Sequence, residues 1–140
     1  MSDRCFVDTN ILLYAHDRST GVKHEQARTL LEALWEARTG VLSTQVLQEF
    51  CVNVRRKAAN PLSLDETRET VADYLSWEIV LNTPASVLEA LDLEKRHKVS
   101  FWDALIIHVA QTSGATVLYS EDLSDGQTYG SVRVVNPLRD

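Results

Sequence analysis

Apolar and polar positions along this chain follow two alternating patterns. Short apolar runs of strand type occupy residues 5–7, 41–42, 77–81, 115–119 and 132–135. Between them, apolar residues recur every three or four positions, which predicts amphipathic helices over residues 10–17, 23–38, 45–58, 64–75, 84–98 and 101–113. Strands that alternate with helices in this way predict an α/β domain with a parallel central sheet.

Capping and stop signals agree with these boundaries. Ser63 and Glu66 have the spacing of a capping box, and Thr83 is followed by a proline at the first helical position. Gly40 and Gly114 stand where the preceding helices should end. At 140 residues with no repeat or linker, we expect one domain spanning residues 1–140.

Composition restricts the class of protein. Hydrophobic residues make up 44% of the chain and charged residues 24%, as in ordinary globular proteins. No apolar stretch approaches the roughly 20 residues that span a bilayer, so we expect no membrane association. Cys5 and Cys51 both lie in apolar settings and are expected to be reduced, which predicts a cytoplasmic protein.

Acidic residues follow two of the strands and lie near the start of two helices. Asp8 and Asp122 come after strands, whereas Glu49 and Asp103 occupy early turns of helices. Three of them have an alternative explanation, since Asp8 and Asp103 suit helix capping and Glu49 suits a solvated helix face. In open α/β sheets, however, ligands bind at the carboxyl ends of the strands, where all four side chains can meet.

Four carboxylates at one site would repel one another and resist ionisation. Oxygen-ligated divalent cations, Mg²⁺ or Mn²⁺ as a substitute, resolve that conflict. A metal held in this way suits the hydrolysis of a phosphodiester. No His and Cys set has zinc spacing, and no glycine-rich loop suggests a nucleotide site.

Basic residues are concentrated in two clusters, although the net charge of −6 argues against binding nucleic acid through bulk positive charge. The first cluster also suits a solvated face, and the second suits the end of a helix, where cations are favourable in their own right. They are nevertheless the candidates for contact with a phosphate backbone. The candidate RNA-binding residues are Arg55, Arg56 and Lys57 in the first cluster and Lys95, Arg96 and Lys98 in the second.

Four short motifs contain these acids. They are Phe6-Val7-Asp8-Thr9-Asn10-Ile11-Leu12, Leu47-Gln48-Glu49-Phe50, Ser100-Phe101-Trp102-Asp103-Ala104 and Tyr119-Ser120-Glu121-Asp122-Leu123. Together they resemble the motifs of PIN-domain nucleases, and more narrowly those of the VapC-type toxins of bacterial toxin–antitoxin pairs. The order and spacing of the four acids agree with the family over essentially the whole chain.

This resemblance implies a three-layer α/β/α sandwich and a Mg²⁺-dependent endoribonuclease. Asp8 and Asp103 would be the principal metal ligands, and Glu49 and Asp122 would complete the acidic pocket. The expected supporting residues, which would orient these ligands, are Thr9, Asn10 and Ser120, with Asp125 as a further candidate in a loop that varies in the family.

The resemblance also implies partners. It predicts an RNA substrate, a cognate antitoxin protein that lies across the acidic pocket, and a homodimer. The alternative is a PIN-like module that binds RNA or protein without cutting. A phosphatase of another α/β type is disfavoured because Asp8-Thr9-Asn10 lacks a second aspartate two residues after the first.

Overall fold

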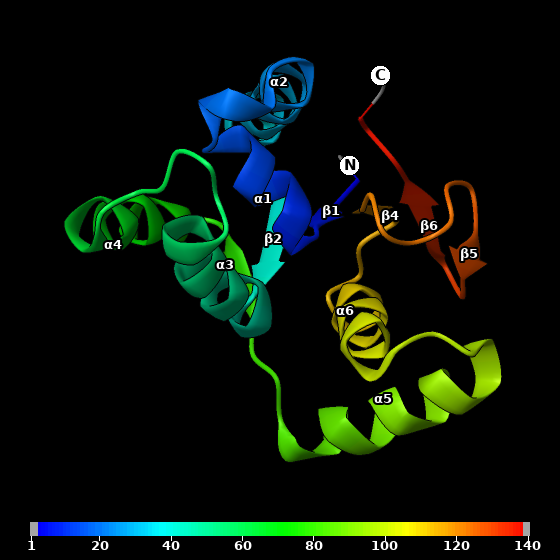
Figure 1. The fold of residues 1–140 in the computed structure, drawn as a ribbon. Helices are drawn as coiled ribbons and strands as arrows, with labels where there is room; N and C mark the ends of the chain where they lie inside the picture. The colour runs from blue at the N-terminus through cyan, green and yellow to red at the C-terminus, as the bar shows by residue number, and fades with distance from the viewer. Residues whose placement is uncertain (1–2, 139–140) are drawn as a thin grey trace.

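The computed structural model describes residues 3–138 and contains six strands, six α-helices and one short 3-10 helix (Figure 1). In chain order these are β1 (Cys5–Val7), α1 (Thr9–Ala15), η1 (Arg18–Thr20), α2 (Val22–Ala37), β2 (Gly40–Ser43), α3 (Thr44–Arg56), α4 (Leu64–Tyr74), β3 (Glu78–Val80), α5 (Pro84–His97), α6 (Phe101–Thr112), β4 (Val117–Tyr119), β5 (Thr128–Tyr129) and β6 (Val132–Val135).

The six strands form one sheet in the order β3-β2-β1-β4-β6-β5. Every neighbouring pair is parallel except β5 and β6, which are antiparallel. The chain leaves β1 toward β2 and β3, and then crosses to the opposite side of β1 to form β4. This reversal of direction creates a topological switch point between the carboxyl ends of β1 and β4, which is where open α/β sheets bind ligands.

The helices form a layer on each face of the sheet. Helix α1 contacts both α2 and α3, and α3 contacts α4, whereas α5 and α6 pack against each other on the opposite side (Figure 1). Right-handed crossovers produce this division, because the connections before and after β3 run in opposite directions across the sheet. The expected α/β/α sandwich is therefore confirmed. None of the helices within residues 3–138 is both long and apolar enough to cross a bilayer.

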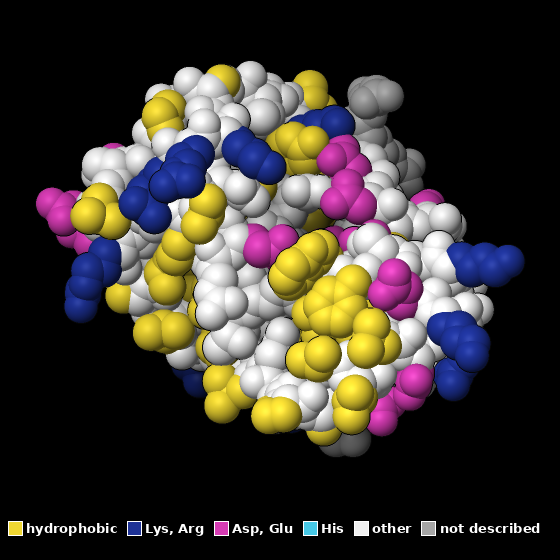
Figure 2. Space-filling model, turned by 60° about the horizontal axis from the view of Figure 1, so that its bottom comes forward, with side chains coloured by type: hydrophobic (Ala, Val, Ile, Leu, Met, Phe, Trp, Pro, Cys, Tyr) yellow, Lys and Arg dark blue, Asp and Glu magenta, His cyan; other side chains and the backbone are white. Residues whose placement is uncertain are grey.

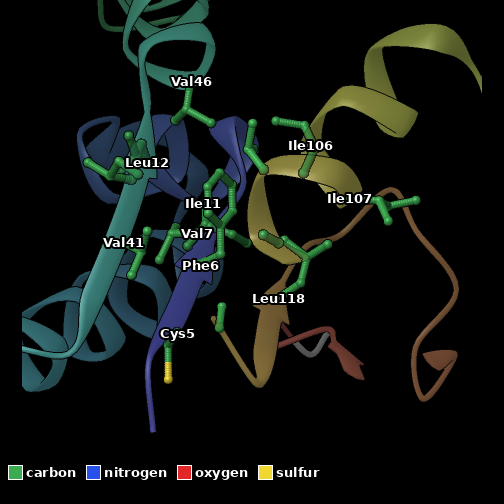
Figure 3. Packing of buried hydrophobic residues seen from close by; sticks show 14 of the residues in the cluster. Cys5, Phe6, Val7, Ile11, Leu12, Val41, Val46, Ile106, Ile107 and Leu118 are labelled. Atoms are coloured by element: carbon green, nitrogen blue, oxygen red, sulfur yellow. The ribbon is translucent and has the colours of Figure 1, made fainter. Parts of the chain in front are cut away.

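The core forms around β1, which is buried along its whole length. Phe6 and Val7 lie between the two helical layers, with Leu118 of β4 beside them (Figure 3). Ile107 reaches the same core from α6, and Ile11 reaches it from α1. A strand that is apolar at every position is what a central parallel strand requires, since both of its faces are covered.

Two short elements and several boundaries differ from the sequence prediction. The segment between α1 and α2 contains η1, which was not predicted, and β5 was not predicted either. Strand β5 has only two residues and forms by pairing with β6, so its own sequence carries no alternating pattern. The helix boundaries shift by one or two residues at most ends, within the usual fraying of helix termini. Cys5 and Cys51 are both free, as expected.

A close approach at the start of β2 leads to the first testable prediction. A Cβ atom on Gly40 would lie 2.3 Å from Cζ3 of Trp77. That indole is buried and packs against Trp35 and Tyr74, so it has little room to move. We expect Gly40→Ala to lower the free energy of unfolding by about 1–3 kcal/mol, as other overpacked cores do. Urea denaturation measures this change.

The double variant Gly40→Ala/Trp77→Leu tests the cause of the destabilisation. With the smaller side chain, the alanine methyl group no longer meets an indole, so the cost of Gly40→Ala should largely disappear. Strictly additive effects of the two substitutions would contradict the proposed clash.

Candidate functional site

Asp8 is a buried carboxylate at the switch point of the sheet. It directly follows β1, and its side chain is 6% exposed. Its Oδ1 accepts a hydrogen bond from the backbone N–H of Thr9 at 2.7 Å, and its Oδ2 accepts one from Ser120 Oγ at 2.8 Å. The backbone N–H of Asp8 donates to the carbonyl of Tyr119. Asp8 therefore caps α1 and also joins the ends of β1 and β4, so capping and a role in the site are compatible.

Two further acids are held near Asp8 by neighbouring polar side chains. Asn10 Nδ2 donates to Asp122 Oδ2 at 2.6 Å. Glu49 Oε1 accepts from Thr9 Oγ1 and from Gln45 Nε2, each at 3.2 Å. The orientations of both carboxylates are therefore set by helices α1 and α3, which begin at this edge of the sheet.

Asp103 reaches the same place from the opposite layer of helices. It lies in the first turn of α6, where its backbone N–H donates to the Ser100 side chain. Asp8, Glu49, Asp103 and Asp122 together line one pocket, which we call the acidic pocket. Its volume of about 70 Å³ is enough for about two waters, at about 30 Å³ each. Figure 2 shows acidic side chains around the hollow in the middle of this face.

The electrostatic environment of the pocket is unfavourable for ionised carboxylates. Burial raises the pKa of Asp8 from 3.8 to about 6, although hydrogen bonds from Ser120 and Thr9 oppose this effect and the charges of Asp122 and Asp103 add to it. Burial also raises the pKa of Asp103. Within residues 3–138, no ion pair includes any of the four acids. The pocket therefore carries an excess of negative charge that no cation of the described residues pairs with.

The donor chemistry of the acidic pocket fits a small, hard cation. All four acids offer only oxygen atoms, which Mg²⁺ and Mn²⁺ prefer. In the described part of the chain, no three His, Cys, Asp or Glu side chains converge closely enough to hold a metal ion. Hydrogen bonds from Asn10 and Thr9 hold two of the carboxylates in their present orientations. Binding a cation would therefore require rotations of side chains within the pocket.

Of the predicted supporting residues, three contact the four acids and one does not. Asn10 and Ser120 each hydrogen-bond one of these acids, and Thr9 hydrogen-bonds two, Asp8 through its backbone N–H and Glu49 through its side chain. Asp125 is not among the residues that line the pocket, and its Oδ1 accepts a hydrogen bond from the backbone N–H of Asn136. Its carboxylate therefore holds the segment after β6, and we do not include Asp125 in the site.

Sequence reasoning missed Gln45, which is 4% exposed and lines the acidic pocket. Its Nε2 donates to Glu49 and, at 3.4 Å, to the carbonyl of Trp102, so it links α3 to α6. Its Oε1 is buried without a hydrogen-bond partner in the described structure. The position of Gln45 one helical turn before Glu49 was the signal that could have identified it.

The two basic clusters lie at the ends of helices, and none of their residues lines the acidic pocket. Arg55, Arg56 and Lys57 end α3, whereas Lys95, Arg96 and Lys98 end α5. All six side chains are exposed. Lys and Arg side chains gather toward the margins of the face shown in Figure 2, away from its acidic centre.

Comparison with known proteins identifies the family and the fold. The model of the PIN domain family matches residues 5–124. No curated protein matches the chain. Among solved structures, VapC20 of Mycobacterium tuberculosis, described as a sarcin–ricin loop cleaving toxin, is 21% identical with a TM-score of 0.65, over 84% of this chain and 89% of that one.

A toxin–antitoxin complex from Klebsiella pneumoniae contains a second similar chain, which is 20% identical with a TM-score of 0.71, over 97% of this chain and 99% of that one. The sequence-based resemblance to PIN domains is therefore confirmed. Because the family match extends from β1 to the loop after β4 and covers well over half of the sequence, the chain belongs to the PIN domain family.

Proposed function

We propose that this protein is an endoribonuclease toxin of the VapC type, which hydrolyses RNA phosphodiester bonds with the help of Mg²⁺ or Mn²⁺. The observation that carries the proposal is the set of four acids around one small pocket, with no cation from the described part of the chain to balance them. Membership of the PIN domain family and the likeness to two toxin structures support it.

In this proposal Asp8 and Asp103 are the principal ligands of the cation, and Glu49 and Asp122 complete the site. A bound divalent cation lowers the pKa of a water, orients it and stabilises the leaving oxygen. Thr9 and Ser120 fix both oxygens of Asp8, so that its carboxylate is oriented before the cation arrives. Asn10 and Gln45 hold Asp122 and Glu49 at the edge of the pocket, and these two carboxylates would rotate to reach the cation.

The two basic clusters are proposed to hold the RNA backbone. They end different helices and do not line the acidic pocket, so they can hold parts of the RNA backbone away from the bond that is cut. Their cations can make contacts with phosphates that do not depend on the base sequence.

Two protein partners belong to the same proposal. A cognate antitoxin is supported by the Klebsiella neighbour, which is described as a toxin–antitoxin complex. A homodimer is supported by the exposed apolar side chains of Leu88 and Leu91 on α5 and of Trp102 beside the pocket. Figure 2 shows hydrophobic side chains gathered next to the acidic centre.

We further propose that residues 1–140 form a single PIN domain and that the protein acts in the cytoplasm.

The first prediction for this site concerns activity. We expect Asp8→Asn and Asp103→Asn each to lower metal-dependent RNA cleavage by at least about 100-fold, because each removes a charged ligand, while the fold is retained. Mapping of RNA 5′ ends after reaction with purified protein in Mg²⁺ or Mn²⁺ measures the loss.

Asp92→Asn is the matched control, since Asp92 is exposed on α5 and lies outside the pocket. Wild-type cleavage by either pocket variant would contradict the proposal. RNA binding by the wild type, without cleavage in either metal, would instead favour the alternative of a PIN-like module that binds RNA without cutting it.

The second prediction concerns stability and pH. The raised pKa means that folded Asp8 binds a proton more tightly than unfolded Asp8, so its ionisation destabilises the fold as pH rises from about 4 through about 6. At about 1.4 kcal/mol per tenfold change in affinity, the difference between 3.8 and about 6 corresponds to about 3 kcal/mol as an upper limit.

Asp8→Asn, which lacks this charge, should therefore raise the free energy of unfolding at pH 7.5, and the gain should shrink below pH 6. Urea denaturation without divalent cations measures both values. Added Mg²⁺ should stabilise the wild type but not the variant. A variant that is less stable than the wild type at pH 7.5 would contradict the electrostatic argument.

The third prediction concerns RNA contact. Charge reversal at Arg55 and Arg56 should weaken RNA binding and reduce the slope of log affinity against log salt by roughly 1.4 if both contact phosphates of a single strand. Fluorescence anisotropy in EDTA measures the slope. Reversal at Arg28 and Arg133, on α2 and β6, is the charge-matched control. An unchanged slope would remove Arg55 and Arg56 from the RNA path.

A further inference from the structure

A second hollow opens beside the acidic pocket and shares part of its wall. It lies between α1, the η1 turn and the end of α3, and its volume is about 210 Å³. Asn10 and Asn53 line both hollows, so the two adjoin. We call this second hollow the Asn53 pocket. It is smaller than the roughly 300–1,000 Å³ of sites for drug-sized ligands, which suits a single base or sugar.

The Asn53 pocket contains two polar groups that the protein does not use. Within residues 3–138, the side-chain amide of Asn53 makes no hydrogen bond and the ammonium of Lys57 makes no ion pair. By contrast, the Tyr14 hydroxyl donates to Glu121 at 2.7 Å, and Asp17 accepts bonds from Ser19 and the backbone N–H of Ala59. The amide and the ammonium are therefore available to a ligand.

These two groups continue a line that begins in the acidic pocket. Glu49, Asn53 and Lys57 follow one another at intervals of four residues along α3 and its C-cap, so they project from the same side of the helix. At 1.5 Å per residue, successive members are about 6 Å apart along the helix axis. The line changes from an acid to an amide and then to a cation as it leaves the acidic pocket.

The opposite wall of the Asn53 pocket is apolar and rigid. Leu13 and Tyr14 of α1 form it. The hydroxyl of Tyr14 is fixed by Glu121, and Lys23 Nζ lies 5.2 Å from the centre of its ring. Aromatic and apolar surfaces of this kind hold bases that have left a stack, and an amide beside them can hydrogen-bond to the edge of a base.

We propose that the Asn53 pocket receives the nucleotide next to the phosphodiester bond that is cut, with Asn53 as the residue that reads its base and Lys57 as the contact to its far phosphate. This inference rests on the proposed nuclease function and adds a determinant of base preference to it. The substrate class is single-stranded RNA, such as a loop, because a paired base cannot enter so small a hollow.

The test measures base preference and salt dependence separately. Short single-stranded RNAs with randomised positions around the cut are incubated with the purified protein and Mg²⁺ or Mn²⁺. The ends of the products are then sequenced. The wild type should prefer one base at a position adjacent to the cut. Asn53→Ala should lower that preference by about tenfold at this position alone, because it removes the amide that reads the base.

Lys57→Gln should leave the base preference intact. In EDTA, it should reduce the slope of log affinity against log salt by roughly 0.7, the value for one phosphate of a single strand. Asn82→Ala and Arg133→Gln are the matched controls, since both residues are exposed and line neither pocket. Circular dichroism establishes that each variant is folded.

The outcomes separate this inference from the nuclease proposal. Two results would overturn the proposed role of the Asn53 pocket and leave the nuclease proposal standing. One is cleavage by Asn53→Ala with the full wild-type base preference, and the other is a wild type with no base preference beside the cut. Base-selective RNA binding in EDTA that Asn53→Ala abolishes, in a protein that does not cleave, would support the pocket and overturn the nuclease. A wild type that binds no RNA would overturn both.

Discussion

The hydrogen bond from Ser120 to Asp8 is the interaction on which the site depends. It joins the ends of β1 and β4 at the switch point of the sheet and fixes a carboxylate in a buried position. A central parallel strand with helices on both faces is buried, and the residue that directly follows it is buried with it. The fold therefore makes ionisation of the Asp8 carboxylate unfavourable by burying it. The same fold orients this carboxylate so that it can bind a cation.

Glu121, an acid outside the pocket, differs from Asp8 in its partners and in the direction of its pKa shift. Glu121 lies between Ser120 and Asp122 in sequence, yet it pairs with Lys23 and accepts a hydrogen bond from Tyr14, and its pKa is lowered. Asp8 has no cation partner among the described residues, and its pKa is raised. Opposite shifts of this kind favour a functional role for the unpaired acid, because a group that served stability alone would be paired.

Helix α3 connects the chemistry of the site with the surface around it. It begins beside β2 with Gln45 inside the pocket, presents Glu49 to the same pocket, and ends in an exposed basic cluster. A single rigid element therefore sets the spacing between acidic, amide and basic groups. In the proposed nuclease, the position at which RNA is cut and the base that is preferred beside it are fixed by the same helix.

The sequence by itself determined the local structure and the identities of the four acids. Apolar periodicity located every strand except β5, and caps such as Ser63 are visible as short motifs that act within one helical turn. Tertiary structure alone decided that Gln45 is buried, that Asp125 points to a different segment, and that Asn10 and Asn53 form a shared wall. These features depend on the order of strands across the sheet, which brings together residues that are distant in sequence and leaves no periodic trace in the chain.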